Sequence, residues 1–438
     1  MIERPIVPAM PTAPATLAEA GLNADAAVQL AAKHLLFDGE LAGTDLATRL
    51  GARYSVIEPA VEQLKRDRLV EIIGGGGLGQ ASYRYRLSEA GRTRASLYLE
   101  QNQYVGPLPV PLEQYRNYMK AASGQRPALI SPATVRAAFS HLVVPDRVLD
   151  QIGPAVAARH SLFVYGPPGN GKTVIARAIG NLLFGEVAVP HAIAVAGHYI
   201  RVFDPMVHQP IEADAPSLTR SPTVDDQRWV RCGRPMVMVG GELTLESLDL
   251  GRAGVGYYSA PLQMIANGGA LVIDDFGRQR VRPADLLNRW IVPLESRVDF
   301  VRLETGQKFE VPFDVLVIFA TNLDPADLVD EAFLRRTKHK VRAGGPTEQE
   351  FAQIFENCCR DQGVPFDPAL LGELIIGELR RRGIELRGCY PRDLIEHALL
   401  LAEYHGRPRA LTGELLSAAC ATYFVEDVRR NQIPDCQT

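Results

Sequence analysis

The first hundred residues alternate between helical and strand-like patterns of apolar side chains. Apolar positions recur at helical spacing over 23–37, 44–50 and 55–68. The runs 69–73 and 83–87 instead alternate with period two, and a glycine-rich loop separates them. This order predicts three short helices followed by a β-hairpin, which together form a small α+β unit.

Proline content and periodicity divide the whole chain into five segments. Four prolines within 1–20 predict an extended or disordered arm, because each proline fixes φ and removes a backbone donor. The small α+β unit covers 21–105, and a proline-dense linker covers 106–123. Buried-strand runs over 124–344 predict an α/β domain with a parallel sheet. The pattern over 345–438 is helical.

A complete phosphate-binding motif lies between a short apolar strand and a helix. Its glycines let the loop curl, so that backbone N–H groups and the positive end of the helix surround the β-phosphate of a nucleotide. Lys172 would reach the β- and γ-phosphate oxygens, and Thr173 would offer its hydroxyl to Mg²⁺. We therefore expect ATP and Mg²⁺ as ligands. The residues expected to contact the nucleotide are Gly166, Pro167, Pro168, Gly169, Asn170, Gly171, Lys172, Thr173 and Val174.

Two further buried-strand patterns end in polar side chains. The run 270–273 ends in Asp274 and Asp275, and the run 315–320 is followed by Asn322 after one threonine. Asp274 would hold Mg²⁺, while Asp275 would orient or deprotonate the water that attacks the γ-phosphate. Asn322 would hold the same water and a phosphate oxygen.

The order of these motifs, followed by a pair of arginines and a Pro-Arg helix, resembles the AAA+ ATPases over roughly residues 124–438. The resemblance implies a parallel-sheet core with a C-terminal helical lid, and a homo-oligomeric ring, usually a hexamer. It implies that Arg392 of the lid senses the nucleotide. It also implies that Arg335 or Arg336 is an arginine finger inserted into the neighbouring subunit's site, and Arg336 is favoured. The alternative is that one of these arginines forms an exposed ion pair with Asp327 or Asp330 on the same surface.

The unit over 21–105 resembles a winged helix-turn-helix module. Such a module can bind DNA through its third helix, and it can equally be a protein-contact module; both interpretations stay open. The basic residues that would contact DNA phosphates are Lys65, Arg66, Arg68, Arg84 and Arg86.

Three further segments of the α/β domain have expected roles. An alternating pattern around a glycine turn predicts a hairpin over 298–311, which resembles the pre-sensor-1 hairpin of one large AAA+ branch. The stretch 204–250 is longer than the usual connection and predicts an inserted segment with another hairpin over 228–239. Tyr257 and Tyr258 would either grip an extended peptide in the pore of a ring or pack in the core.

The segment before the phosphate-binding motif also resembles a family feature. Its apolar residues Leu142, Val143 and Val144 are candidates to pack on the adenine base, although a core role explains them nearly as well.

Charge, cysteines and apolar runs restrict the class of protein. Acidic residues outnumber basic ones, 51 to 47, so the overall charge does not favour nucleic acid as a partner. The six cysteines lack the spacing of a zinc site and are expected to be reduced thiols. No apolar run approaches the roughly 20 residues that span a bilayer, so we expect no membrane partner and a cytoplasmic location.

Three functions follow from these features. The first is a chaperone-like AAA+ ATPase ring that remodels a protein substrate, recruited directly or through an adaptor. The second is a DNA-acting ATPase that loads, translocates or regulates transcription through the winged-helix unit. The third is a scaffold that binds ATP and barely hydrolyses it, because Asp275 is shorter than the glutamate of most relatives. The acidic balance favours the first.

Overall fold

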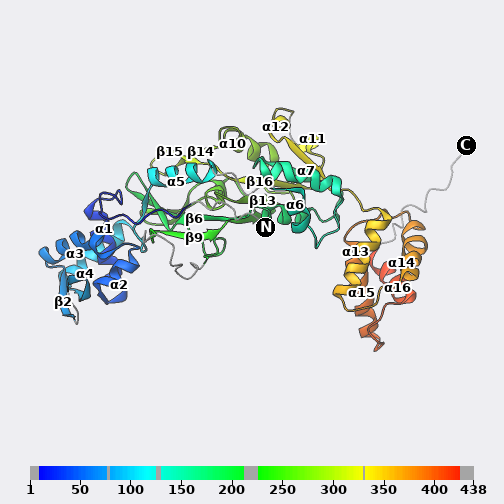
Figure 1. Ribbon diagram of the computed structural model, residues 1–438, viewed down its shortest axis with the longest axis horizontal. Helices are drawn as coiled ribbons and strands as arrows, with labels where there is room; N and C mark the ends of the chain where they lie inside the picture. The colour runs from blue at the N-terminus through cyan, green and yellow to red at the C-terminus, as the bar shows by residue number, and fades with distance from the viewer. Residues whose placement is uncertain (1–8, 76–78, 125–129, 212–224, 329–330, 425–438) are drawn as a thin grey trace, which may run out of the picture.

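The computed structural model describes residues 9–75, 79–124, 130–211, 225–328 and 331–424 (Figure 1). The N-terminal helices lie at one end of the molecule, the strands fill the middle, and the last helices form a lobe at the other end. None of the helices in these ranges is both long and apolar enough to cross a membrane.

The N-terminal unit packs its helices against a three-stranded antiparallel sheet of order β1-β3-β2. The predicted hairpin is present, since β2 pairs with β3. Helix α1 begins after Asn23, whose side chain accepts a hydrogen bond from the Ala26 N–H at 3.0 Å. The elements are α1 (Ala24–Asp38), β1 (Glu40–Ala42), α2 (Gly43–Arg49), α3 (Tyr54–Arg66), β2 (Val70–Gly75), β3 (Tyr83–Leu87) and α4 (Glu89–Gln101).

The expected linker over 106–123 contains regular structure instead. Val110–Pro111 forms strand β4, which pairs with a strand about eighty residues later, and Leu112–Gly124 forms helix α5. Tyr115 of this helix is 1% exposed, so α5 is anchored in a core. The prolines permitted this because a proline loses its N–H donor but keeps its carbonyl acceptor, which an edge strand can use.

The described part of the expected arm, residues 9–20, is also ordered. Thr12 forms an antiparallel bridge with Asp225, and the Pro11 carbonyl accepts a hydrogen bond from the Asp226 N–H at 2.8 Å. Ala20 is fully buried. The expectation of disorder is therefore wrong for these residues, while residues 1–8 lie outside the described part of the chain.

A second sheet, of order β11-β12-β8-β7-β4, joins the N-terminal unit to the α/β domain. The predicted hairpin over 228–239 is wrong. The strand formed by its first half, β9, pairs with β6, whereas the strand formed by its second half, β10, joins the central sheet. The strands of this region are β6 (Glu186–Pro190), β7 (Ala192–Val195), β8 (His198–Arg201), β9 (Trp229–Gly233), β11 (Gly251–Gly254) and β12 (Tyr257–Ser259).

Aromatic side chains hold the N-terminal unit against the second sheet. The ring of Tyr104 contacts Tyr199 at 5.4 Å and Tyr257 at 6.0 Å between ring centroids, in both cases edge-on. Tyr258 is 5% exposed. Both candidate pore tyrosines thus pack within the chain, which agrees with the core interpretation of this segment.

The central sheet is entirely parallel, with strand order β10-β13-β16-β5-β17. Strands β13 and β16 are buried along their whole length, which explains their uninterrupted apolar runs. The strands are β5 (Leu162–Tyr165), β10 (Met236–Val239), β13 (Ala270–Ile273), β16 (Leu316–Thr321) and β17 (His339–Arg342). The parallel-sheet α/β fold class is therefore confirmed.

Helices cover this sheet, and the predicted hairpin is present as an antiparallel pair of β14 (Val298–Arg302) with β15 (Lys308–Pro312). The helices are α6 (Pro132–Ala138), α7 (Asp146–Ala157), α8 (Lys172–Asn181), α9 (Leu262–Ile265), α10 (Pro283–Ser296), α11 (Pro325–Leu328) and α12 (Glu331–Arg336).

The C-terminal lobe is helical, as predicted. Its first helix begins with reciprocal hydrogen bonds: the Glu350 N–H donates to Thr347 Oγ1 at 3.3 Å, and the Thr347 N–H donates to Glu350 Oε2 at 2.8 Å. The elements are α13 (Glu348–Asp361), α14 (Pro368–Gly372), a π-helical stretch (Glu373–Arg380), α15 (Tyr390–Tyr404) and α16 (Gly413–Tyr423).

A lysine is buried beneath the segment that leaves the N-terminal unit. Lys33 of α1 is fully buried, and its Nζ donates to the Tyr104 carbonyl at 3.3 Å. Among the described residues, no carboxylate forms an ion pair with it. Burial lowers the pKa of Lys33 from 10.5 to about 8. Its charge therefore opposes folding at neutral pH.

Replacing Lys33 with methionine is expected to stabilise the chain by about 2 kcal/mol at pH 7, because an apolar side chain of similar length replaces a buried cation. Between pH 8 and 10.5 the unfolded chain holds this proton and the folded chain does not, so the native chain gains stability as pH rises through this window. The advantage of Lys33→Met should therefore shrink toward pH 10.5. Urea unfolding of both proteins across this range measures it, and equal stabilities at pH 7 would contradict it.

Candidate nucleotide site

The predicted phosphate-binding loop connects the end of β5 to the start of α8. Gly166, Gly169 and Gly171 have φ angles of +143°, +81° and +72°, which L side chains rarely adopt. A Cβ on Gly166 would also lie 2.3 Å from the Ala343 carbonyl oxygen. The backbone conformation therefore favours glycine at all three positions, and at position 166 the neighbouring carbonyl also leaves no room for a side chain.

The loop lysine is folded back onto its own loop. Lys172 is 7% exposed, and its Nζ donates to the Pro167 carbonyl at 2.8 Å. Burial lowers the pKa of Lys172, and the charges of Asp275 and Asp274 oppose that shift. The structure thus brings the lysine within electrostatic range of both predicted carboxylates.

The two aspartates form a tight turn after β13. The Asp275 N–H donates to Asp274 Oδ1 at 3.0 Å, and Asn322 Nδ2 donates to Asp275 Oδ1 at 3.1 Å. Asp275 has a φ of +48°, a conformation that aspartate tolerates better than most non-glycine residues. Asp275 and Asn322 therefore meet as the sequence predicted.

Gln279 supports this turn and was not found from the sequence. Its Nε2 donates to the carbonyls of Asp274 and Asp275 at 2.9 and 3.2 Å, and its Oε1 accepts from the Gly277 N–H at 2.8 Å. The only sequence signal for this role is its position six residues after the end of β13, which no motif marks.

The residues present fit a nucleotide with Mg²⁺. The glycine loop directs N–H groups toward one point at a helix N-terminus, which suits a phosphate. Thr173, in the first turn of α8, and Asp274 supply the hard oxygen ligands that Mg²⁺ prefers. In this structure the Lys172 ammonium is bonded to a carbonyl of its own loop, which a phosphate oxygen would replace.

A small cavity of about 60 Å³ lies beside the loop where the base would sit. Val143 and Val144 line it, while Leu142 and Val144 also pack against the apolar core of the domain; packing of these residues on adenine stays a prediction. Ile354 and Gly388 of the helical lobe close its far side. Residues of both the α/β domain and the helical lobe thus line one cavity beside the loop.

The helical lobe contacts the phosphate-binding loop through backbone hydrogen bonds. The Cys389 N–H donates to the Gly169 carbonyl at 2.8 Å, and the Gly388 N–H donates to Asn170 Oδ1 at 3.2 Å. A Cβ on Gly169 would lie 2.7 Å from Cys389 Sγ. The loop and the lobe therefore fit together with no room for a side chain at Gly169.

Two sequence families match parts of this chain. Residues 146–198 match "Magnesium chelatase, subunit ChlI", and residues 347–422 match "Domain of unknown function (DUF8689)". A curated protein of Rothia mucilaginosa (strain DY-18), described as an "AAA ATPase forming ring-shaped complexes", is 27% identical over 203 residues. Those residues are 46% of this chain and 27% of that protein, so the chain spans about a quarter of the length of this relative. These parts of the chain are therefore similar to an AAA ATPase and to a magnesium chelatase subunit.

Solved structures of AAA+ proteins superpose on parts of it. NtrX of Brucella abortus in complex with ADP has a TM-score of 0.41 and 14% identity, over 78% of this chain and 68% of that one. The RuvB Holliday junction branch migration motor of Thermotoga maritima has a TM-score of 0.37 and 14% identity, over 63% and 68%.

The predicted lid arginine is paired at the surface of the helical lobe. Arg392 forms an ion pair with Asp393 at 2.9 Å, and its side chain is 65% exposed. Arg387 lies at the loop instead, with its Cδ 3.5 Å from where a Cβ on Gly169 would be. Its charge contributes to lowering the pKa of Lys172. Sequence reasoning chose Arg392 because it belongs to the Pro-Arg helix motif, whereas Arg387 lies in a loop without a pattern.

The predicted arginine fingers lie near the amino end of strand β5, whereas the phosphate-binding loop follows its carboxyl end. Arg335 and Arg336 line a cavity of about 640 Å³ together with His160 and Ser161, which precede β5. The loop follows the other end of β5, and four strand residues span roughly 13 Å. Arg336 Nε lies 2.5 Å from Glu295 Oε1, so this arginine is in a surface ion pair, although Glu295 is not one of the two expected partners; of those, Asp330 lies outside the described residues.

The position of Arg387 gives a direct test. Replacing Arg387 with alanine is expected to raise the Kd for ATP about tenfold, because a hydrogen bond to a charged phosphate contributes roughly 1.5–3 kcal/mol. Arg392→Ala is the matched control and should change the Kd less than about threefold, because the native side chain is already paired on the lobe surface. Calorimetric titration with ATP and Mg²⁺ measures both. If Arg392→Ala instead raised the Kd for ATP more than Arg387→Ala does, Arg392 would be the lid arginine that contacts the nucleotide.

Proposed function

We propose that this AAA+ chain forms a homo-oligomeric ring, hydrolyses ATP at sites shared between neighbouring subunits, and uses the energy to remodel a protein partner. The observation that carries the proposal is the position of Arg335 and Arg336 at the sheet edge opposite Lys172. Strand β5 separates them from the phosphates of their own subunit, so they would act on a neighbour. The description of the Rothia mucilaginosa relative as ring-forming supports a closed assembly, for which we propose six subunits.

The chemistry assigned to this site follows from its hydrogen bonds. Asp275 Oδ1 is held by Asn322, which leaves Oδ2 to accept a proton from the attacking water. Asn322 would hold the same water, and Asp274 with Thr173 would hold Mg²⁺. When bound, Mg²⁺ neutralises charge on the β- and γ-phosphates. The arginine of the neighbour would stabilise the charge that develops on the transferred phosphoryl group.

The charge of the N-terminal unit favours a protein partner over DNA. Residues 21–105 contain ten basic and ten acidic residues, so the unit has no excess of positive charge. Three of its candidate phosphate contacts are already paired: Lys65 lies 2.7 Å from Glu62, Arg86 lies 3.1 Å from Glu71, and Arg84 lies 3.9 Å from Glu40. Binding DNA would require these ion pairs to break.

The position of the third helix also favours a protein partner over DNA. A winged-helix module that reads DNA inserts the N-terminal residues of this helix into the major groove. Here Arg53 and Tyr54 at the start of α3 line a cavity of about 320 Å³ together with Asp225 and Gln227 of the α/β domain. We therefore propose that the N-terminal unit is a winged-helix module that recruits a protein, with DNA binding as the alternative outcome.

Mixing two inactive variants tests the shared site. Lys172→Ala removes the phosphate contact and Arg336→Ala removes the finger, so each alone should lose at least about 100-fold in ATP turnover. In a ring formed from equal amounts of both, about a quarter of the sites combine an intact loop with a neighbour's intact arginine, and turnover should recover to about that fraction. Phosphate release measures it, with mass determined in parallel.

Two results would contradict this shared site. A mixture as inactive as its components would place the finger within its own subunit or outside the mechanism. Assembly with ATP but almost no turnover in the native chain would favour the ATP-dependent scaffold.

Asp275 can be tested without changing the size of its side chain. Asp275→Asn is expected to lower kcat about 100-fold, because an amide cannot accept the proton of the attacking water. The Kd for ATP should stay within about threefold, since Lys172 and the glycine loop are untouched. Single-turnover hydrolysis together with ATP titration separates the two quantities. An unchanged kcat would exclude Asp275 as the base.

A further inference from the structure

The sheet of the N-terminal unit ends in a strand that has a neighbouring strand on one side only. Strand β2 is the last in the order β1-β3-β2, and Figure 1 shows it at the end of the molecule away from the α/β domain. Residues 71–74 of this strand are all exposed. We call the open side of β2 over residues 70–73 the β2 edge. An open strand edge is a template on which another strand can pair.

The register of the hairpin shows which backbone groups face the β2 edge. The Ser88 N–H donates to the carbonyl of the opposite residue, Leu69, at 3.0 Å, so these two residues form a hydrogen-bonded pair. Bonded and non-bonded pairs alternate along an antiparallel ladder, which makes Glu71 the next bonded residue of β2. Val70 and Ile72 belong to the non-bonded pairs, and their N–H and C=O groups therefore point away from β3.

The apolar face of this sheet is exposed at the same place. Ile72 lies opposite Tyr85, and opposite residues of an antiparallel pair share one face of the sheet. Tyr85 is fully buried, whereas Ile72 is 46% exposed because the sheet ends at its strand. The neighbouring Ile73 is 37% exposed. A strand added beside β2 would place a side chain against Ile72 and extend the apolar core of the unit.

A β-bulge limits how long a strand can pair here. The register between β2 and β3 shifts between Ile72 and Gly74, so Ile73 is the extra residue. A bulge twists an edge strand and prevents continued pairing beyond it. The β2 edge is therefore suited to a short extended segment of a few residues.

Charge favours a different protein over a second copy of this chain as the occupant. In two copies, the antiparallel register that uses the outward groups of both Val70 and Ile72 places one Glu71 opposite the other, and like charges in that position are destabilising. On the solvent face, Glu40, Arg86 and Glu71 already form a row across the three strands, with charges that alternate. A lysine or arginine on a fourth strand would continue this row beside Glu71.

We propose that the β2 edge binds an extended segment of a protein partner, which adds a fourth strand to the N-terminal sheet. The main chain of the segment bonds to the outward N–H and C=O groups of Val70 and Ile72. Two apolar residues of the segment lie on the core face, where one covers Ile72, and the basic residue between them faces Glu71. This inference rests on the proposed role of the N-terminal unit in recruiting a protein, and it adds the mode of recognition.

The test selects binding segments from random peptides displayed on phage, with the full chain immobilised and no nucleotide present. The selected peptides are expected to share two β-branched or aromatic residues on either side of a lysine or arginine. A selected peptide is then synthesised with a fluorescent label and titrated with the native chain. Hydrogen exchange of the native chain should show that the bound peptide protects the Ile72 amide, and no protection there overturns the proposal.

Two substitutions of one residue separate strand pairing from a contact with its side chain. Ile72→Pro removes an outward N–H but no bond of the hairpin, and an edge strand tolerates proline at such a position. It is expected to raise the Kd for the peptide at least about tenfold. Ile72→Thr keeps the N–H and should raise the Kd less than about fourfold. Both variants should keep Tm within about 3 °C of the native value. Equal effects of the two substitutions would contradict strand pairing.

Failure of this proposal is distinguishable from failure of the proposed function. Ile72→Pro should keep the native ATP turnover, and Lys172→Ala should keep peptide binding, because the β2 edge lies outside the nucleotide site. A peptide that binds Ile72→Pro as tightly as the native chain overturns the β2 edge and leaves the recruiting role standing. A library that yields no binding peptide also overturns it. So does a dimer that Ile72→Pro dissociates, because a second copy would then occupy the edge.

Discussion

Parallel pairing of β5, β16 and β13 determines where every group of the nucleotide site lies. In register, Phe163 of β5 faces Phe319 of β16, which faces Ile273 of β13. The carboxyl ends of the three strands therefore reach the same edge of the sheet. The phosphate-binding loop follows the first, Asn322 follows the second, and the aspartate pair follows the third. Because both faces of these strands are buried, a shift of register would move polar side chains into the core.

This rigid sheet supports backbone conformations that would not persist alone. The loop glycines and Asp275 occupy left-handed conformations, and such positions in a non-glycine residue are costly unless their surroundings fix them. Gln279 holds the aspartate turn from one side. From the other, Thr321 Oγ1 donates to the Phe276 carbonyl at 2.6 Å. The left-handed backbone also gives a physical reason for aspartate here, because a short polar side chain tolerates this conformation better than glutamate does.

The sequence predicted the elements whose signal lies in neighbouring residues. It missed the strand pairings and contacts that form between residues far apart in the chain. Buried apolar runs predicted β13 and β16 correctly, and the glycine spacing predicted the loop, because both signals are local. The sequence predicts a linker where strand β4 lies, because two residues with a proline carry no periodicity and pair with a strand far along the chain. The same limit explains β10, which pairs with β13 rather than with its neighbour β9. Gln279 and Arg387 have their roles only because the fold brings them to the turn and the loop.

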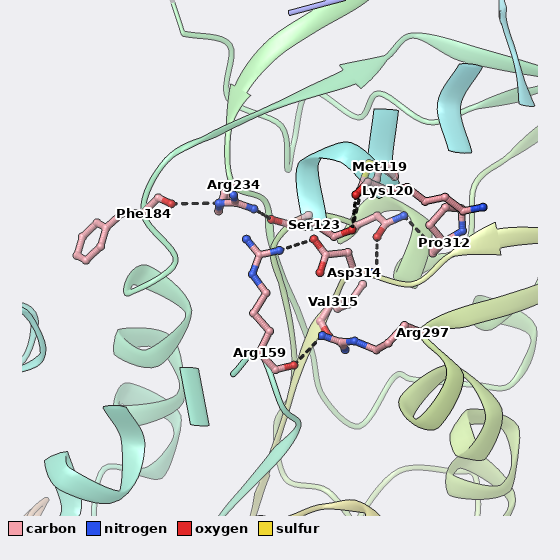
Figure 2. Close-up of polar contacts among 12 residues, drawn as sticks. Met119, Lys120, Ser123, Arg159, Phe184, Arg234, Arg297, Pro312, Asp314 and Val315 are labelled. Atoms are coloured by element: carbon pink, nitrogen blue, oxygen red, sulfur yellow. Dashed lines mark hydrogen bonds and ion pairs between the residues drawn. The ribbon is translucent and has the colours of Figure 1, made fainter. Parts of the chain in front are cut away.

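The two edges of the central sheet differ in chemistry, and the difference follows from strand direction. The carboxyl edge holds one lysine, two aspartates and an asparagine around a loop shaped for phosphate. Arginines lie near the amino ends of the strands. Arg297 lines both the cavity that contains the candidate fingers and a second cavity that contains Arg159 and Asp314 (Figure 2). A parallel sheet cannot bring these two sets together within one subunit, because the strands lie between them. In the proposed ring the amino edge of one subunit faces the carboxyl edge of the next.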